Sequence, residues 1–241
     1  MDVVNNADGS PAYQGGDGVA DLYSGLGSVA GFVGHSNGGI LGTILAATDP
    51  YVQTYVLANP GGVYTDIFQK SAEISPIVNA GLAAKGVTVG SPDYYAFMVA
   101  AQTVADDADP FNYAPLAAVA GKSILLFKQK GDLVVPNAST DLLSAALGLP
   151  QVVPAGNPNG LTMANWPLGI QQSPYPGSGF VHFLEGTHSS FLKPDPYAPP
   201  ATLVGMDVMT EMQTETAGFL AAGTINITNS TGPLSGLAIV E

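Results

Sequence analysis

The chain has 241 residues, which is enough for one large domain with its own hydrophobic core. Charged residues make up 10% of it, against about 25% in an average protein, and six Lys face nineteen Asp and Glu with no Arg, so the net charge is −13. This balance argues against nucleic acid and anionic membranes as partners, because both bind proteins through Lys and Arg. The lack of Cys excludes disulfides, thiolate metal ligands and Cys nucleophiles.

Residues 1–28 are polar and rich in Gly, which is typical of a loop, and their start lacks the basic and apolar regions of a signal peptide. Four short apolar runs follow along the chain, bounded by Gly, Pro or Asn. Such runs predict strands that are buried on both faces of a sheet. The runs are Val29–Gly34, Val52–Ala58, Ser123–Phe127 and Gly179–Leu184.

Helices are predicted after the first and third runs, over Asn37–Thr48 and Pro136–Leu147, because apolar residues recur there at helical spacing. Strands that alternate with helices indicate an α/β protein with a mostly parallel sheet. A long helix is predicted over Ala201–Ala222, ending at Gly223, and a β-like segment over Thr224–Thr228 follows it.

Two long connections interrupt this alternation. Residues 61–121 contain helical stretches around Thr65–Lys85 and Pro92–Ala105, and a connection of this length is typical of a lid or binding cap. Residues 150–178 hold six Pro with little periodicity, which predicts an ordered but irregular segment. The apolar cap residues fit an acyl-chain groove and a helix-packing core equally well; they are Val63, Tyr64, Ile67, Phe68, Tyr94, Tyr95, Phe97 and Met98.

The end of the first strand carries a possible nucleophile, in the sequence Gly34-His35-Ser36-Asn37-Gly38, which matches G-x-S-x-G. A serine on a sharp strand-to-helix turn is held in a strained conformation, and its neighbours are Gly because side chains there would collide. The hydroxyl of Ser36 then projects over the carboxyl edge of the sheet. The backbone N–H of Asn37, at the helix N-terminus, is expected to point at the same space and to stabilise an oxyanion.

A serine nucleophile needs a base, and the chain has three His. The side chain of His35 is expected to diverge from the turn. His182 lies inside the last predicted strand, where a His of the core or sheet edge is expected. His188 follows that strand in a loop at the carboxyl edge, so elimination and position both favour it as the base.

The acid that orients the base is expected beyond a strand end, between the serine and the histidine in the chain. Asp132 meets this condition directly after the third strand. Asp106, Asp107 and Asp109 are interpreted as capping or solvating the end of the second cap helix, and Asp141 as facing water. The order Ser36, Asp132, His188 is that of α/β-hydrolases.

The chain resembles a known family at these residues and in its cap. The segments Gln102–Tyr113, Gly131–Asn137 and Phe219–Gly223 are similar to bacterial extracellular lipases of the Pla-1/cef (virulence-factor) group. The likeness extends over roughly residues 30–228. It implies carboxylester hydrolysis, an extracellular or cell-surface location, and catalytic positions identical to those above.

The sequence departs from a full hydrolase sheet at its front, because only about 30 residues precede the serine motif. We expect one domain over residues 1–241, with a truncated sheet and a helical cap over 61–121. The outer edge of the first strand is then an exposed pairing template, to be covered by residues 1–28, by residues 224–240 or by a second copy of the chain in a homo-oligomer. A second oxyanion donor is sought in Gln14–Gly16, for which a flexible Gly turn is the alternative.

These observations favour a serine carboxylester hydrolase that acts on short- to medium-chain esters without metal or organic cofactor. The acidic clusters Asn5–Asp8 and Asp106–Asp109 lack the spacing of a calcium loop and are interpreted as solvated loops. One alternative is a catalytically inactive remnant that binds an apolar ligand or partner. Another is an acyltransferase, in which an alcohol replaces water as the acceptor of the acyl group.

Overall fold

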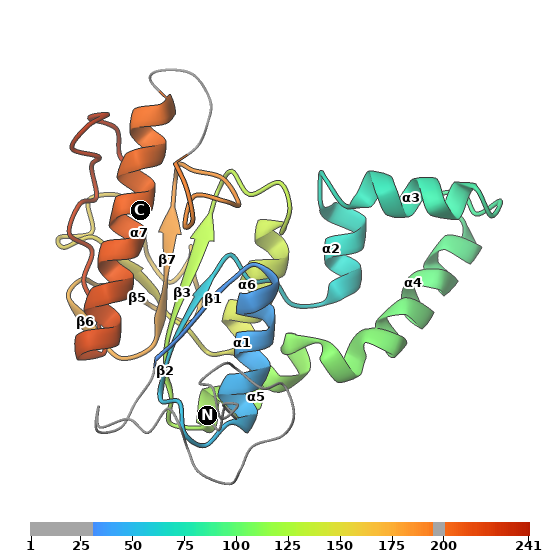
Figure 1. Ribbon diagram of the computed structural model, residues 1–241, viewed down its shortest axis with the longest axis horizontal. Helices are drawn as coiled ribbons and strands as arrows, with labels where there is room; N and C mark the ends of the chain where they lie inside the picture. Colours follow the sequence, from blue (N-terminus) through green and yellow to red (C-terminus); the bar gives the residue numbers. More distant parts are fainter. Residues whose placement is uncertain (1–30, 195–200) are drawn as a thin grey trace, which may run out of the picture. The chain divides into compact units, whose positions relative to one another are not determined.

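The computed structural model describes residues 31–194 and 201–241. The predicted loop 1–28, including Gln14–Gly16 and the cluster Asn5–Asp8, lies outside these residues. The main sheet is parallel throughout and has the strand order β1-β2-β3-β7-β4-β5 (Figure 1). Its strands are β1 (Phe32–His35), β2 (Thr54–Ala58), β3 (Ser123–Gln129), β4 (Gln151–Val153), β5 (Ile170–Gln172) and β7 (Gly179–Phe183).

Helices cover both faces of this sheet. One face packs against α1 (Asn37–Thr48), α5 (Pro110–Val119) and α6 (Asn137–Ala146), and the other against the long helix α7 (Ala201–Ala222) (Figure 1). The remaining elements are α2 (Tyr64–Lys70), α3 (Ser75–Ala83), α4 (Pro92–Ala105), the 3₁₀ turn η1 (Asp106–Ala108), and the antiparallel pair β6 (Tyr175–Pro176) and β8 (Thr224–Ile225). Within the described residues, no helix combines the length and hydropathy needed to span a membrane.

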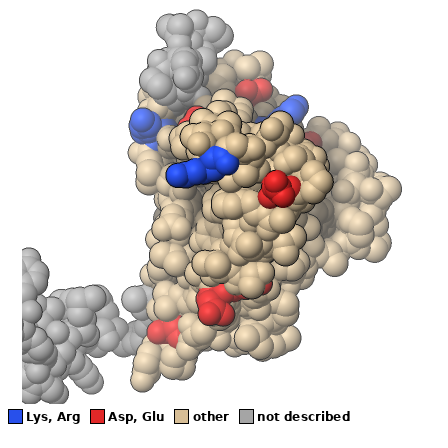
Figure 2. All heavy atoms as spheres, turned by 90° about the vertical axis from the view of Figure 1, so that its right-hand side faces the viewer, with Lys and Arg blue, Asp and Glu red and all other residues tan. Residues whose placement is uncertain are grey.

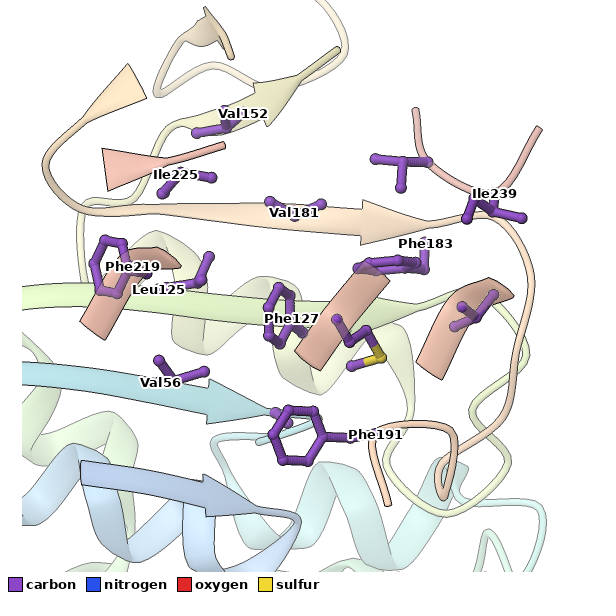
Figure 3. Close-up of a cluster of buried hydrophobic side chains, with 14 of the residues drawn as sticks. Val56, Leu125, Phe127, Val152, Val181, Phe183, Phe191, Phe219, Ile225 and Ile239 are labelled. Atoms are coloured by element: carbon purple, nitrogen blue, oxygen red, sulfur yellow. The ribbon is translucent and has the colours of Figure 1, made fainter. Parts of the chain in front are cut away.

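The central strands are apolar on both faces because each face is covered by helices. Toward α7, the buried side chains of β2, β3 and β7 meet Val208, Met212 and Phe219 (Figure 3). Toward α1, α5 and α6, the alternate side chains of the same strands form a second cluster. The strand residues facing α7 include Val56, Leu125, Phe127, Val181 and Phe183, and those on the opposite face are Tyr55, Leu57, Ile124, Leu126 and Phe180.

The four strands, the two central helices and the long final helix are confirmed, whereas the connections differ from expectation. The predicted helix 65–85 is two helices. The backbone is extended at Ser71, which ends α2, and Pro76 lies in the first turn of α3. A further helix, α5, follows η1. Residues 150–178 are less irregular than expected, since β4 and β5 are short strands that extend the main sheet beside β7.

The outer edge of β1 pairs with no strand in the part of the chain that the structure describes. The C-terminal segment does not cover it, so that expectation is wrong. Instead, β8 pairs with β6, and Val240 bridges to Phe183 at the end of β7. Coverage of the β1 edge by residues 1–28, which lie outside the described residues, or by a second copy of the chain stays a prediction.

The architecture is an α/β-hydrolase fold. Parallel strands β1, β2, β3 and β7 are adjacent, α1 follows β1 through a sharp turn, and helices lie on both faces. The carboxyl ends of parallel strands share one edge of a sheet, so the loops after β1, β2, β3 and β7 meet there.

Candidate active site

The turn after β1 holds Ser36 in a strained conformation. Its φ is 57° and its ψ is −121°, a combination rarely adopted outside Gly. The backbone N–H of Ser36 donates to the carbonyl of Ala58 at 2.8 Å, which ties the turn to the end of β2. Ser36 is the N-cap of α1, yet its side chain makes no capping hydrogen bond. The hydroxyl is therefore available for another partner.

The glycines around Ser36 do not all serve the purpose that the motif suggests. A Cβ on Gly34 would lie 2.3 Å from the carbonyl oxygen of Gly38, so Gly34 is required. A Cβ on Gly38 would meet no atom within 4 Å beyond its own helix, so the expected collision does not occur there. The tight position is the next one, since a Cβ on Gly39 would lie 3.1 Å from Pro60.

The structure brings the three side chains selected from the sequence together. The hydroxyl of Ser36 donates to Nε2 of His188 across 2.8 Å, and Nδ1 of His188 donates to Oδ2 of Asp132 across 2.7 Å. The side chains of His188 and Asp132 are only 13% and 3% exposed. Three residues from the loops after β1, β3 and β7 thus form one continuous hydrogen-bonded chain.

Two glycines let the loops of Asp132 and His188 approach each other. A Cβ on Gly131, directly before Asp132, would lie 2.3 Å from the carbonyl oxygen of Gly186 in the loop that carries His188. Gly186 has a φ of +98°, which L side chains rarely adopt. The same loop is braced by Ser190, whose hydroxyl accepts from the N–H of Thr187. Close backbone contact at Gly131 therefore sets the spacing between the two loops.

The carboxylate of Asp132 accepts two hydrogen bonds at each oxygen. Oδ1 accepts from the N–H groups of Val134 and Val135, at 2.9 and 2.8 Å. Oδ2 accepts from His188 and from the side-chain amide of Asn59, the latter at 3.0 Å. Sequence reasoning missed Asn59, although its position directly after β2, at the same edge of the sheet, was a usable signal.

His35 does not diverge from the site, contrary to expectation. Its Nε2 donates to the backbone carbonyl of His188 at 2.5 Å, and the centroids of the two rings are 4.9 Å apart. His35 pairs with Ala58 in the sheet, and Ala58 belongs to the cluster that contains Phe191. The ring of His35 lies on this face and stacks against the ring of Phe191. Burial lowers the pKa of His35 by more than the hydrogen bond to the His188 carbonyl raises it, so the neutral ring is favoured.

His182 has a separate environment, as the sequence suggested. It lies within β7, and its Nδ1 contacts the carboxylate of Glu241. Burial lowers the pKa of His182, and the adjacent Lys128 lowers it further. Its Nε2 is buried without a hydrogen-bond partner among the described residues. It takes no part in the Ser36–His188–Asp132 chain.

The rival carboxylates have structural partners of their own. Asp109 is fully buried rather than solvated: it N-caps α5 and accepts from the N–H groups of Val63 and Tyr64. Asp106 and Asp107 lie in η1. Asp141 forms an ion pair with Lys128 at 2.8 Å instead of only facing water. Within the described ranges, no group of three or more His, Asp or Glu has the arrangement of a metal site.

Asn37 is the first residue of α1. The first N–H groups of a helix have no acceptor within it, so the N–H of Asn37 remains available to a ligand above Ser36. The role of this N–H toward an oxyanion stays a prediction.

The apolar residues of the cap divide between core and surface. Tyr94 and Met98 are buried against Leu82, whereas Tyr95 and Phe97 are exposed. A groove of about 400 Å³ lies between α2 and α4. Its lining is Thr65, Gln69, Tyr95, Met98, Val99, Gln102 and Thr103.

No protein-family model and no curated protein matches this sequence. Among solved structures, the chain is similar to an acylaminoacyl peptidase from Pyrococcus horikoshii, with 12% identity and a TM-score of 0.45 over 81% of this chain and 24% of that one. It is similar to an enol-lactonase from Burkholderia xenovorans (17% identity, TM-score 0.33, 76% of this chain and 66% of that one). An α/β fold family hydrolase from Bacillus anthracis is similar at 11% identity, with a TM-score of 0.38 and coverage of 68% and 63%. The chain thus spans 24% of the peptidase's length, and the fold assignment rests on the strand order and the turn at Ser36.

Proposed function

We propose that the protein is a serine hydrolase that cleaves carboxylic esters, an esterase or lipase. The observation that carries this proposal is the chain of hydrogen bonds from Ser36 Oγ through the imidazole of His188 to Asp132, at 2.8 and 2.7 Å. A hydroxyl is activated as a nucleophile when it is hydrogen-bonded to a base and a third group orients that base.

In the proposed reaction, Oγ of Ser36 attacks the acyl carbon while Nε2 of His188 takes the hydroxyl proton. The tetrahedral intermediate collapses, its C–O bond to the alcohol breaks, and His188 returns the proton to the departing alcohol. The acyl group is then an ester of Ser36. Water attacks that ester while His188 takes a proton from the water. The carboxylic acid is released when His188 returns the proton to Oγ of Ser36.

Asp132 and His35 hold the base for these steps. Because Asp132 can only accept, Nδ1 of His188 carries the proton and Nε2 is left free to receive the one from Ser36. His35 fixes the backbone at His188 through the carbonyl oxygen. The imidazolium that forms on His188 lies beside the nearly buried carboxylate of Asp132, which stabilises its positive charge.

We assign the N–H of Asn37 as one donor to the oxyanion. A helix N-terminus supports negative charge, and Asn37 directly follows the nucleophile. Loss of one oxyanion donor typically costs about 10²–10³ in kcat. Turnover is therefore expected to be slow unless a second donor is supplied, for which Gln14–Gly16 remains our candidate.

Uncharged esters with short or medium acyl chains are the proposed substrates. The net charge of −13 disfavours anionic ligands. The side of the protein formed by α3 and α4 carries only scattered charges (Figure 2). Tyr95, Phe97 and Val99 of α4 are exposed there and can contact an acyl chain.

Two further expectations stay predictions. Export or surface attachment follows only from the lipase resemblance. A homo-oligomer through the β1 edge follows from the lack of a strand beside that edge within residues 31–194 and 201–241. Sedimentation at micromolar concentration tests the oligomer, and a run that shows only monomer would contradict it.

The test of function compares wild type with Ser36→Ala on p-nitrophenyl esters of increasing acyl length. We expect hydrolysis by the wild type and a fall of about 10⁶-fold in kcat for Ser36→Ala, because the covalent route is removed. Equal, background rates for both proteins would favour an inactive, ligand-binding remnant. Product analysis with added alcohol separates hydrolysis from acyl transfer, since a transferase yields a new ester.

A further inference from the structure

Asn59 lies directly behind the acid of the proposed active site. It follows β2 and is 1% exposed. Its side-chain amide donates one hydrogen bond to Oδ2 of Asp132 at 3.0 Å and another to Oε1 of Gln129 at 2.8 Å. The oxygen of Asp132 that it contacts is the one that accepts from His188. Asn59 and the proposed base His188 therefore donate to the same oxygen of Asp132.

The backbone of Asn59 is built for this position. Its φ is 54°, in the left-handed region that Asn, Asp and Gly adopt more readily than other residues. Its N–H donates to the carbonyl of Phe127 at 3.0 Å, which fixes the residue to the end of β3. The amide is thus anchored to the sheet, whereas Asp132 lies in the loop after β3.

We propose that Asn59 is a positioning residue for the hydrolase reaction, acting through Asp132. The side-chain amide of Asn59 holds the carboxylate of Asp132 so that Oδ2 stays in line with Nδ1 of His188. This inference rests on the proposed function, because it assigns a role in the same site. Asn59 itself is not expected to touch substrate.

The amide can meet its neighbours in only one orientation. Both of its contacts, Asp132 Oδ2 and Gln129 Oε1, are acceptors here, so turning the amide would set its carbonyl oxygen against two other oxygens. Gln129 is held in turn, because its own amide N–H contacts the sulfur of Met212. The carbonyl oxygen of Asn59 is buried without a partner among the described residues. Leaving that oxygen unpaired costs stability. The arrangement thus supplies a hydrogen bond to Asp132 at the expense of a partner for the carbonyl oxygen of Asn59.

The hydrogen bond from Asn59 also has an electrostatic effect. It partly compensates the negative charge of Asp132, and without it that charge attracts a proton on His188 more strongly. The acid limb of the pH profile of kcat/KM reports protonation of the base in the free enzyme. Removal of the amide should therefore move that limb to higher pH. Among the described residues, His35 also lies beside His188, and it is the same in every variant.

The experiment uses Asn59→Gly and Asn59→Asp in the full chain, both of which tolerate a left-handed backbone. Gly removes the donor, and Asp keeps the shape but sets a second acceptor against Asp132. We expect kcat/KM for p-nitrophenyl esters to fall by about 10- to 100-fold, since small misplacement of a reacting group costs about that much. The acid limb should move up in the order wild type, Gly, Asp.

Asn157→Gly is the matched control, because Asn157 has a φ of 46° and its hydrogen bonds within the described residues stay in its own loop, to Pro154, Gly160 and Leu161. It should keep the rate and the pH profile of the wild type. Thermal unfolding by circular dichroism verifies that each variant is folded. Wild-type rates in both Asn59 variants, or a loss of rate that is equal at every pH, would overturn the positioning role.

A proton NMR readout separates this inference from the proposed function. An imidazole N–H bonded to a carboxylate gives a resonance at unusually low field, and we expect the Asn59 variants to shift or broaden that of His188. If Ser36→Ala keeps full esterase activity, the proposed function fails, whatever the Asn59 variants do. If Ser36→Ala is inactive while the resonance and the rates of the Asn59 variants match the wild type, only the positioning role fails.

Discussion

Two of the buried carboxylates of this protein, Asp132 and Glu215, lie in very different surroundings. The side chain of Asp132, at the carboxyl edge of the sheet, is 3% exposed and accepts four hydrogen bonds. Glu215, in the middle of α7, is 1% exposed, and neither of its oxygens has a partner within the described residues. Burial raises the pKa of Glu215 well above its usual value, and the neighbouring Glu211 raises it further. Hydrogen-bond donors, more than depth, decide whether a carboxylate can stay charged.

The local backbone explains the difference. Loops after parallel strands leave N–H groups free, and two of them bond Asp132. The N–H groups in the middle of a helix are already bonded to carbonyls of the preceding turn, so α7 offers Glu215 none. Glu211, one turn earlier, does find donors on the C-terminal segment, in Thr228 and Asn229. Glu215 has no such donor, and burial beside Glu211 favours its neutral form.

The largest expected effect comes from replacing each of the two carboxyl groups with an amide. Asp132→Asn should lower kcat by about 10⁴-fold, because an amide can hold His188 in the wrong tautomer. Glu215→Gln should leave kcat unchanged, since Glu215 lies in α7 and takes no part in the Ser36–His188–Asp132 chain. Steady-state kinetics on one p-nitrophenyl ester compares both variants with the wild type. Similar losses in the two variants would show that burial alone matters.

A smaller effect is expected where the two loops of the site touch. Gly131→Ala would place a Cβ 2.3 Å from the carbonyl oxygen of Gly186, so the loops of Asp132 and His188 must separate. We expect kcat/KM to fall by about 10²-fold.

Gly218→Ala is the control for this substitution. Gly218 lies within α7, and a Cβ there meets nothing within 4 Å. It should keep full activity and gain about 1 kcal/mol in the free energy of unfolding, from higher helix propensity. Wild-type kcat/KM in Gly131→Ala would mean that the spacing of the loops does not limit catalysis.

The smallest effect concerns stability and pH. The carboxyl of Glu215 has an ordinary pKa of 4.5 when unfolded and a raised pKa when folded, so the unfolded chain binds fewer protons between these two values. The contribution of Glu215 is therefore fully present below pH 4.5 and is lost as pH rises through the folded pKa. Glu215→Gln removes this loss. Its melting temperature should match the wild type near pH 4.5 and exceed it by on the order of 5 °C at pH 8.

Thermal unfolding of both proteins by circular dichroism from pH 4.5 to 8 checks this prediction. The difference between the two proteins is the quantity to follow, because other groups, including His182 with its lowered pKa, also titrate over this range. A difference that is constant with pH would contradict the account of Glu215.

The sequence predicted the core of the fold and the three side chains that the structure brings together. Ser36, Asp132 and His188 each follow a buried strand, and parallel strands carry such positions to one edge. Helix α1 was predicted at its observed bounds, because Ser36 precedes it and its apolar spacing is regular. These features depend on local pattern, which a sequence displays directly.

What the sequence could not supply depends on contacts between distant segments. The bond from Asn59 to Asp132 joins residues 73 apart in the chain, and that from His35 to His188 joins residues 153 apart. Strands β4 and β5 have three residues each and owe their form to pairing with neighbours rather than to an apolar run. The buried state of Glu215 likewise arises from packing of α7, since a Glu in a helix is usually exposed.

The most direct test of the central claim is covalent labelling with a fluorophosphonate, followed by intact mass measurement and peptide mapping. We predict one adduct per chain, on Ser36, formed at least about 10³-fold more slowly in His188→Ala, because the hydroxyl then has no base. No adduct on the wild type, an adduct on another residue, or an equal rate in His188→Ala would contradict the claim that His188 activates Ser36.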